Sequence, residues 1–319
     1  EAIECALKMG KKFTRKHEVI ALMCSFHGRT LGTLSVTGQW GRRRYDMGPY
    51  LGGVSFAPAP YCYRCSLGQT YPECGIQCAH MIEDIIEYSS SNNVAEFIAE
   101  PILGEGGIIV PPPEYFKTVK KIIDQHGIIF IDDEVQTGFG RTGRMFGIEH
   151  YQVTPDIMCL AKGIASGMPL GACMAKAEIA DSYEPGDHLS TFGGNPVSCA
   201  AGVASLDVML EQDLPKQSQT KGEYLLKRIR ELQSTESIIG EVRGRGLMVG
   251  VELVEEHKHK TPAEGKAAKI KELLRMKGIL VGVGGVKGNV VRIQPPLVIT
   301  EQQLDTLIDH LAGSMREAR

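Results

Sequence analysis

The 319-residue sequence predicts an α/β fold with a mostly parallel sheet sandwiched by helices, followed by a smaller C-terminal α+β domain. Two observations lead to this prediction. Short apolar runs typical of buried strands alternate with helical segments between residues 19 and 162, and this repeated order favours a parallel sheet. After residue 212, charged helices and a hairpin-like segment replace the alternation. We therefore predict a large domain over residues 1–207 and a small domain over residues 208–319.

The composition is that of an ordinary globular protein. Apolar residues make up 43% and charged residues 23% of the chain. The net charge of −3 provides no general attraction to nucleic acid or to a membrane surface. No uninterrupted apolar span approaches the ~18 residues of a transmembrane helix, and no signal peptide is visible. We expect a cytoplasmic protein. Because the chain opens inside an amphipathic helical pattern, we also expect that an N-terminal segment is missing.

The first strand is expected over residues 19–25, and the polar turn Phe-His-Gly-Arg-Thr follows it. In this turn Phe26 could stack on a planar ring, and Arg29 could bind a carboxylate or a phosphate. A turn that starts a helix and leaves its arginine exposed would explain the same residues. Residues 38–78 are expected to form a long irregular excursion. Further elements of this half are expected at 80–88 and 113–125 (helices) and at 94–99, 128–131, 157–161 and 172–175 (strands).

The stretch from Ile128 to Gly167 contains the strongest functional signal. The strand over 128–131 ends on Asp132, Asp133 and Glu134, at the end where open α/β sheets bind ligands. The strand over 157–161 is followed directly by Lys162. A lysine fixed after a buried strand needs a partner or a function, although its amine could also reach solvent. Together the two strands suggest a Schiff-base lysine with an acidic partner for a pyridinium nitrogen.

In the second half, the Gly-rich turn over 188–196 offers hydroxyl and backbone N–H groups suited to an anion such as phosphate. The same glycines could simply introduce the following helix. Arg292 lies within an expected strand before two prolines, where it could face inward to a substrate carboxylate or stand at an edge. The elements expected around it are helices over 196–212, 216–232, 267–277 and 301–311, a strand over 247–253 and a hairpin over 279–295.

Nine cysteines in a chain of this length do not suggest a disulfide framework. Cys62, Cys65, Cys74 and Cys78 are clustered with the spacing C-x2-C-x8-C-x3-C. Four thiolates could hold zinc or an iron–sulfur cluster, and a surface loop with free thiols is the alternative. Only the first pair has the tight spacing of a zinc knuckle, so we predict no metal site.

Six motifs together resemble a known family. They are FHGRT from Phe26, AEPILGEGG from Ala99, DEVQTGFGRTG from Asp133, AKGIASGMPLG from Ala161, STFGGNP from Ser190 and VRIQPPL from Val291. In this order they resemble the class III (ω-amino acid) aminotransferases, which belong to the fold-type I group of pyridoxal 5'-phosphate (PLP) enzymes. The resemblance covers essentially the whole chain. It implies the fold-type I architecture and PLP as the cofactor.

The resemblance also implies roles for individual residues. Lys162 matches the lysine that holds PLP as a Schiff base and then transfers the substrate proton. Asp133, rather than Asp132, matches the acid that keeps the pyridine nitrogen protonated. A homodimer or higher oligomer with shared active sites is implied as well. The other implied cofactor contacts are Gln136 at the phenolic oxygen, Phe26 stacked on the ring with His27 beside it, and Thr191 at the phosphate of the neighbouring subunit.

Three residues resemble the family's substrate-binding set. Arg292 matches the arginine that binds an α-carboxylate, and Glu105 matches the glutamate that masks this arginine while an ω-amine enters. When 2-oxoglutarate arrives, Glu105 would swing away from Arg292. Arg29 is the candidate for the distal carboxylate. The presence of both Glu105 and Arg29 is similar to 4-aminobutyrate aminotransferases.

We therefore predict a PLP-dependent transaminase that moves an amino group from an ω-amino acid to 2-oxoglutarate, with 4-aminobutyrate as the expected donor. The alternatives are a class III amino acid racemase, an alanine–glyoxylate-type aminotransferase and, more remotely, a metal-binding module on the Cys62–Cys78 loop. Two departures from the family stand out. The phosphate-binding turn that would precede Glu1 is absent from the sequence, and the cysteine-rich loop is not general to the class. The iron–sulfur cysteines of animal 4-aminobutyrate aminotransferases precede the FHGRT segment, whereas Cys62 and Cys65 follow it, so we do not transfer that cluster.

Overall fold

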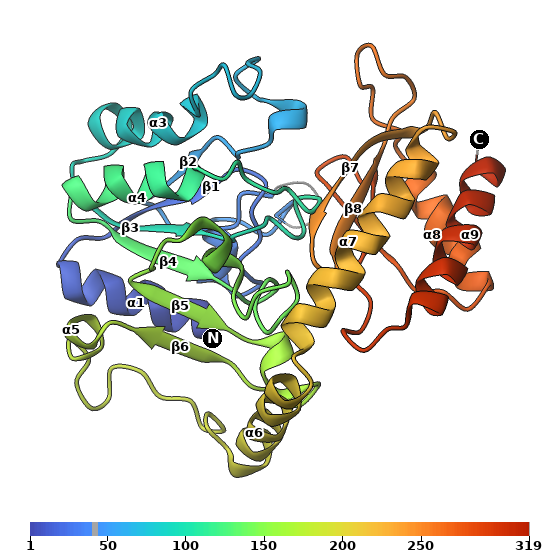
Figure 1. Ribbon diagram of the computed structural model, residues 1–319. Coiled ribbons are helices and arrows are strands. Elements are labelled where there is room, and N and C mark those ends of the chain that lie inside the picture. The colour runs from blue at the N-terminus through green and yellow to red at the C-terminus, as the bar shows by residue number, and fades with distance from the viewer. Residues whose placement is uncertain (40–43, 319) are drawn as a thin grey trace.

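The computed structural model describes residues 1–39 and 44–318, which form two sheets with helices packed on them (Figure 1). The larger sheet has the strand order β2-β1-β3-β4-β5-β6. Neighbouring strands are parallel except for β6, which runs antiparallel to β5. The predicted mostly parallel sheet is therefore confirmed. Its strands are β1 (Glu18–Leu22), β2 (Val54–Ala57), β3 (Val94–Ala99), β4 (Ile129–Asp133), β5 (Ile157–Leu160) and β6 (Ala172–Ala175).

Helices cover both faces of this sheet, and alternating side chains of each central strand serve the two faces. On β4, Ile129 and Ile131 pack in the core formed with α1 (Ala2–Thr14). Phe130 points to the opposite core, where it stacks on Phe116 with ring centroids 5.8 Å apart. That second layer contains α3 (Gln77–Asp84) and α4 (Tyr115–Gln125). Burial on both faces explains why β4 reads as an uninterrupted apolar run.

Three local predictions need correction. The first strand ends at Leu22, not at Ser25, because Cys24 adopts a φ of 66° that an extended strand cannot contain. The expected irregular excursion over 38–78 includes the edge strand β2, whose partly buried residues leave only a weak apolar signal. The helix expected over 80–88 starts earlier, as α3, and ends in a π-helical turn at Ile85–Ser89.

The FHGRT turn starts a helix, which was the alternative explanation of its sequence. The short helix α2 (Leu31–Ser35) is capped by Thr30, whose side chain accepts a hydrogen bond from the Thr33 amide. Phe26 and Arg29 thus lie on a turn that is anchored at both ends, between β1 and α2.

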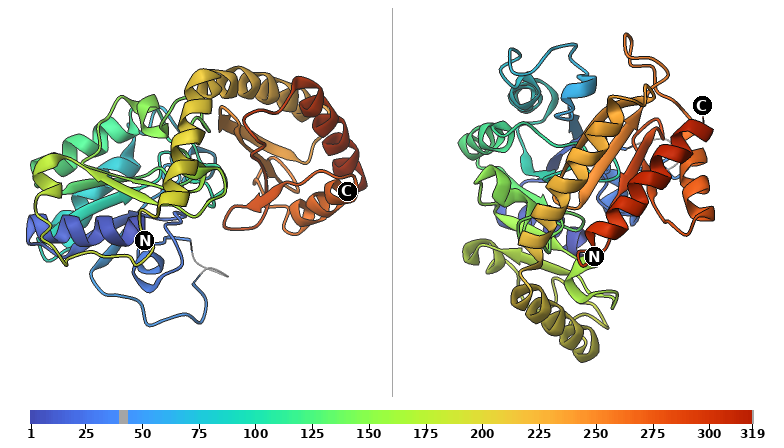
Figure 2. Two further views of the ribbon diagram at one scale, coloured as in Figure 1. Left: turned by 90° about the horizontal axis from the view of Figure 1, so that it is seen from below. Right: turned by 45° about the vertical axis from the view of Figure 1, so that its right-hand side comes forward.

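The smaller sheet is antiparallel, has the order β7-β8-β10-β9 and has a hydrophobic core of its own. Figure 2 shows its helices α7 and α9 on the side away from the larger sheet. The predicted domain boundary at 207/208 falls within α6 (Pro196–Glu211) and stays a prediction. The elements are β7 (Ile239–Arg245), β8 (Met248–Leu253), β9 (Gly282–Gly284), β10 (Val290–Ile293), α7 (Leu214–Gln233), α8 (Lys266–Met276) and α9 (Glu301–Glu317).

In the part of the chain that the structure describes, no helix combines the length and the apolar character needed to cross a membrane.

Candidate active site

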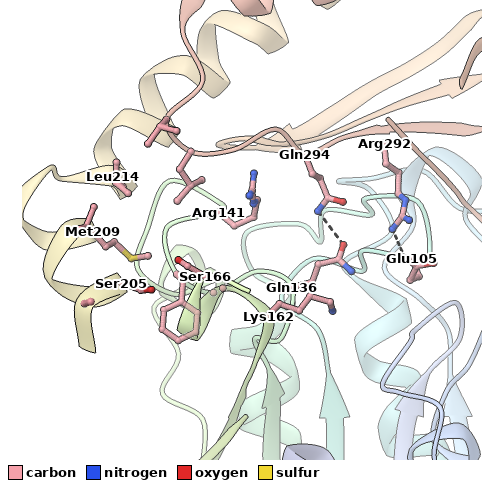
Figure 3. Close-up of a pocket in the computed structure, with 17 residues that line it drawn as sticks. Glu105, Gln136, Arg141, Lys162, Ser166, Ser205, Met209, Leu214, Arg292 and Gln294 are labelled. Carbon is pink, nitrogen blue, oxygen red and sulfur yellow. Dashed lines mark hydrogen bonds and ion pairs between the residues drawn. The ribbon is translucent and has the colours of Figure 1, made fainter. Parts of the chain in front are cut away.

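Lys162 stands where β5 gives way to a 3₁₀ turn at Lys162–Ala165. Its φ of 43° lies in the left-handed region, which costs a non-glycine residue on the order of 1 kcal/mol and is typical of functional sites. The side chain lines a cavity of about 730 Å³, and its amine lies near Gln136 (Figure 3). Among the described residues, no hydrogen-bond or ion-pair partner of this amine is found. The lysine thus presents an amine to a cavity that can accept a ligand.

Asp133 is buried at the end of β4, with both carboxylate oxygens engaged. Its Oδ2 atom lies 2.8 Å from His27 Nδ1, and its Oδ1 atom accepts the Val135 amide at 3.0 Å. His27 is buried too, and its Nε2 atom has no partner among the described residues. These contacts hold the Asp133 carboxyl group in one orientation.

Asp132 is buried like its neighbour but differs from it in its contacts. It is fully buried, and within the described residues no donor reaches either of its carboxyl oxygens. Burial, and then the nearby acids Glu134 and Asp133, raise the pKa of Asp132 well above its ordinary value. A neutral Asp132 cannot serve as a counter-charge, so the surroundings of the two acids support the preference for Asp133.

Glu105 and Arg292 form the predicted pair at the cavity (Figure 3). Arg292 Nη1 lies 2.6 Å from Glu105 Oε1 and also donates to the Gly104 carbonyl at 3.4 Å. Beside them, Gln294 Nε2 donates to Gln136 Oε1 at 3.1 Å. A Cβ atom at Gly104 would lie 2.1 Å from Gln136 Oε1, so a larger residue there would displace the Gln136 side chain from this position. The structure therefore brings Glu105, Gln136, Lys162 and Arg292 to one cavity.

Glu100 connects the Phe26 turn to the Glu105 segment. Its two carboxyl oxygens accept the amides of Phe26 and Gly104, each at 2.9 Å. Burial raises the pKa of Glu100 to about 7. The acid at the end of β3 therefore has a structural function, because it fixes two segments that carry predicted site residues.

The remaining predicted residues do not line this cavity. The Arg29 guanidinium lies over the Phe26 ring, 5.3 Å from its centroid, and Arg29 is otherwise exposed. Thr191 is exposed in the turn before α6. His27 lines a second cavity of about 1070 Å³, which also includes Ala161 and residues of the same Gly-rich turn. The two cavities therefore meet the chain at adjacent residues, because Ala161 lines the second cavity and Lys162 lines the first.

Four polar residues of the cavity were not predicted: Ser166, Ser205, Gln294 and Arg141. Gln294 could have been found, because it is two positions after Arg292 and so shares its face of the strand. Arg141 carries no comparable signal. Its buried Nη1 atom donates to the carbonyls of Leu247 at 3.0 Å and Pro295 at 2.5 Å, and burial lowers the pKa of Arg141 to about 10. Arg141 thus joins segments that only the tertiary fold brings together.

The residues present fit PLP. Lys162 would supply an amine for the cofactor's aldehyde, and Asp133 would supply an oriented carboxylate for the ring nitrogen. The Gly-rich turn beside the second cavity, with Ser190, Gly193 and Gly194, supplies hydroxyl and backbone N–H groups for a phosphate.

The cysteine-rich loop has a different arrangement from a metal centre. Cys62, Cys65, Cys74 and Cys78 line a cavity of only about 20 Å³, and all four are free thiols. Within residues 1–39 and 44–318, no group of three or more His, Cys, Asp or Glu side chains is placed to hold a metal ion.

Comparison with known proteins identifies the family. The sequence profile of the aminotransferase class-III family matches residues 1–315. The chain is 39% identical over 318 residues to the leucine/methionine racemase of Thermococcus litoralis, covering 99% of this chain and 71% of that protein. It is 39% identical over 311 residues to the acetylornithine aminotransferase of Methanothermobacter thermautotrophicus, covering 98% and 71%. It is 34% identical over 319 residues to the probable 4-aminobutyrate aminotransferase of Bacillus subtilis, covering 99% and 73%.

The fold is shared with solved transaminases. An amine transaminase from an uncultivated Pseudomonas species, solved in its PLP-bound form, superposes with a TM-score of 0.93 at 34% identity. The match covers 100% of this chain and 75% of that one. The chain belongs to the class-III aminotransferases, a family of PLP-dependent enzymes.

Proposed function

We propose that the protein is a transaminase that moves an amino group from an ω-amino acid, with 4-aminobutyrate as the expected donor, to 2-oxoglutarate. The observation that carries this proposal is the Glu105–Arg292 ion pair, formed in the same cavity as Lys162. Both members of the pair are largely buried. Breaking such a pair without replacing it would leave an uncompensated charge, so the arginine is released only to a ligand with its own carboxylate.

This pair can distinguish the two substrates of a transamination. While Glu105 neutralises Arg292, the cavity does not attract an α-carboxylate. An ω-amine, which has no carboxylate on the carbon that bears the amino group, can then approach Lys162. An α-oxo acid brings a carboxylate that can bind the Arg292 guanidinium in a bidentate manner in place of Glu105. The distal carboxylate needs a second cation, for which Arg29 stays the proposed residue.

The catalytic roles that we propose follow from position. When bound, PLP supplies the electron sink that makes the substrate's α-hydrogen acidic. Lys162 holds the cofactor and then carries the proton as general acid and base. Asp133, oriented by His27, provides the negative charge at the ring nitrogen. Gln136 is proposed at the phenolic oxygen, and its amide is already oriented by Gln294.

A racemase is the main alternative, because one relative is named as such. Racemisation needs a proton donor on each face of the substrate carbon. Among the described residues that line the cavity, Glu105 is paired with Arg292, and Arg141 is engaged by two carbonyls. Lys162 is then the side chain best placed to transfer a proton, which favours transamination.

The proposed function is tested by presenting the purified protein and PLP with a panel of amine donors, including 4-aminobutyrate, alanine and acetylornithine. Each donor is combined with 2-oxoglutarate, pyruvate or glyoxylate, and a chiral assay follows racemisation. We expect glutamate to form from 2-oxoglutarate with ω-amine donors. Transfer restricted to α-amino donors, or racemisation without transfer, would contradict the proposal.

Substitution of Glu105 separates the two half-reactions. In Glu105→Ala, Arg292 is unmasked at all times, so we expect the 4-aminobutyrate half-reaction to slow roughly tenfold. The 2-oxoglutarate half-reaction should change by no more than about twofold, because Arg292 is still available. Single-turnover rates measured for each half-reaction give the comparison. Equal losses in both would argue against a gate at Glu105.

We also propose a homodimer in which the partner covers α6. The helix buries only Ser198, Gly202 and Met209, although its first three turns carry no charge. An exposed apolar surface of this kind is typical of a protein interface. Its most exposed large apolar side chains, with those of the preceding turn, are Leu189, Phe192, Val197, Val203 and Leu210.

The position of this surface connects the interface with catalysis. α6 packs directly on the Lys162 turn, because a Cβ added at Gly202 would be in van der Waals contact with the Ile164 carbonyl oxygen at 3.4 Å. A partner seated on α6 would therefore stand beside the Lys162 cavity, and the exposed Thr191 would be free to reach a neighbouring site. We expect light scattering to give about twice the chain mass of 34.8 kDa, and a charge at Val203 (Val203→Glu) to produce monomers with little activity. A monomeric wild type would contradict the shared site.

A cytoplasmic location is proposed from the nine cysteines, none of which forms a disulfide in the described structure.

A further inference from the structure

Glu105 lies on a segment with little stiffness of its own. In Gly104–Ile108, the sequence G-E-G-G-I places glycines on both sides of the glutamate, and glycine has more backbone freedom than any other residue. Gly107 adopts a φ of 114°, which other residues rarely do. The Glu105 carbonyl accepts hydrogen bonds from the Gly285 amide at 3.0 Å and from Gln39 Nε2 at 3.1 Å. Within the segment, the Gly107 and Ile108 amides donate to the Gly104 carbonyl at 3.2 Å, and contacts from outside the segment then fix where Glu105 stands.

Arg243 of β7 makes the largest set of these outside contacts. Its Nε atom donates to the carbonyls of Gly107 and Ile108 at 3.1 and 3.0 Å, and its Nη2 atom donates to Gly107 at 2.6 Å. The residue is 8% exposed and does not line the Lys162 cavity. Because the guanidinium group is planar and rigid, it can hold two consecutive carbonyl groups at once.

The opposite side of the guanidinium group is fixed by buried charge. Glu252 of β8 is fully buried and lies 2.6 Å from Arg243 Nη1. The Tyr61 hydroxyl and Arg64 Nε also donate to Glu252. Burial alone would raise the pKa of Glu252, but Arg243 and these two donors outweigh it and lower this pKa. Glu252 thus stays ionised and anchors Arg243. A buried ion pair of this kind is stable when further hydrogen bonds satisfy its polar atoms.

We propose that Arg243 is a positioning residue that holds Glu105 in register with Arg292 and so sets the preference for ω-amine donors over α-amino donors. The inference rests on the proposed transaminase function. Arg243 acts at a distance from the substrate: Glu252 anchors the guanidinium group, the guanidinium group holds the Gly107 and Ile108 carbonyls, and these hold the backbone of Glu105. Only the Glu105 side chain then needs to move when an oxo acid enters.

The conservative variant Arg243→Lys tests this chain of contacts. A lysine keeps the positive charge near Glu252 but cannot hold two carbonyl groups with one ammonium group. We expect the single-turnover kcat/KM for 4-aminobutyrate to fall roughly tenfold, as for a modest misplacement of a site residue. The value for 2-oxoglutarate should stay within about twofold. Amide hydrogen exchange at Gly106 to Ile108 should become faster.

A double-mutant cycle separates positioning from general damage. The measured quantity is the ratio of kcat/KM for 4-aminobutyrate to kcat/KM for 2-oxoglutarate. If Arg243 acts through Glu105, then adding Arg243→Lys to Glu105→Ala should not change this ratio further. Leu307→Ala is the matched control, because it truncates a buried side chain in the core of the smaller sheet without touching the Glu105 segment. It should lower the Tm and leave the ratio unchanged.

Glu252→Gln provides a second variant, because it removes the fully buried one of the two carboxylates that contact Arg243, the other being Glu241, and does not alter the Glu105 segment itself. It should shift the ratio in the same direction as Arg243→Lys, so the inference can be tested even if one variant fails to fold. Two outcomes would overturn the inference in a protein whose wild type still transfers amino groups. One is an equal loss of rate in both half-reactions. The other is a double variant in which the effects of Arg243→Lys and Glu105→Ala on the ratio of the two rates multiply. A wild type that transfers no amino group from any ω-amine overturns the proposed function itself.

Discussion

Lys162→Ala is expected to abolish covalent attachment of PLP and to lower the rate of amino transfer by at least about 10³-fold. The loss has two physical sources, since one amine both holds the cofactor and carries the substrate proton. The amine faces the cavity from a left-handed turn, and the described residues that line this cavity include no second lysine to take its place. Reduction with borohydride and peptide mass spectrometry of the PLP-loaded protein would locate the attachment.

Lys266→Ala is the control for this experiment. Lys266 lies on α8, where it pairs with Glu255 at 2.7 Å and does not line the cavity. It should keep both the adduct and the activity. An adduct that survives in Lys162→Ala would place the reactive amine elsewhere and would refute the proposed site.

Asp133→Asn is expected to lower the rate of amino transfer roughly 10²-fold and to weaken PLP binding. The amide has nearly the shape of the carboxylate, but it removes the negative charge that would keep the ring nitrogen protonated. His27, which contacts Asp133 at 2.8 Å, would also lose its charged acceptor. Rates are measured at saturating PLP, and PLP affinity is measured separately by fluorescence titration.

The neighbouring acid provides a matched comparison. Burial already favours the neutral form of Asp132, because its pKa is raised well above the ordinary value. Asp132→Asn therefore removes little charge at neutral pH, and we expect activity within about threefold of the wild type. If the two variants were equally impaired, the effect at Asp133 would be attributed to packing of β4 and not to charge at the cofactor.

Much of the fold could be predicted from local patterns. β4 and β5 read as apolar runs because both faces of the central sheet are covered, and each run ends where the polar residues begin. β2 and the direction of β6 could not be read in this way. An edge strand has a weaker apolar pattern, and a strand's direction depends on how the chain returns to the sheet, which hydrophobic periodicity does not encode.

The candidate site shows the same division. From its own surroundings in the sequence, Arg292 was as compatible with an edge strand as with a substrate cavity. Its 2.6 Å contact with Glu105 is made between β10 of the smaller sheet and a loop that follows β3 of the larger one. Family resemblance implied this pair, but neither partner's neighbours in the sequence point to the other.

The sequence by itself determined that Lys162 follows a buried strand, that acids end the strand before it, and that six motifs of one family occur in order. These properties depend on the period of side chains along a strand and on which residues are buried, and both are local. Only the tertiary structure decided that no donor among the described residues reaches Asp132 while Asp133 contacts His27, and that Arg243 contacts the Glu105 segment from another sheet. Such contacts join elements distant in sequence, and they depend on how the two sheets pack together.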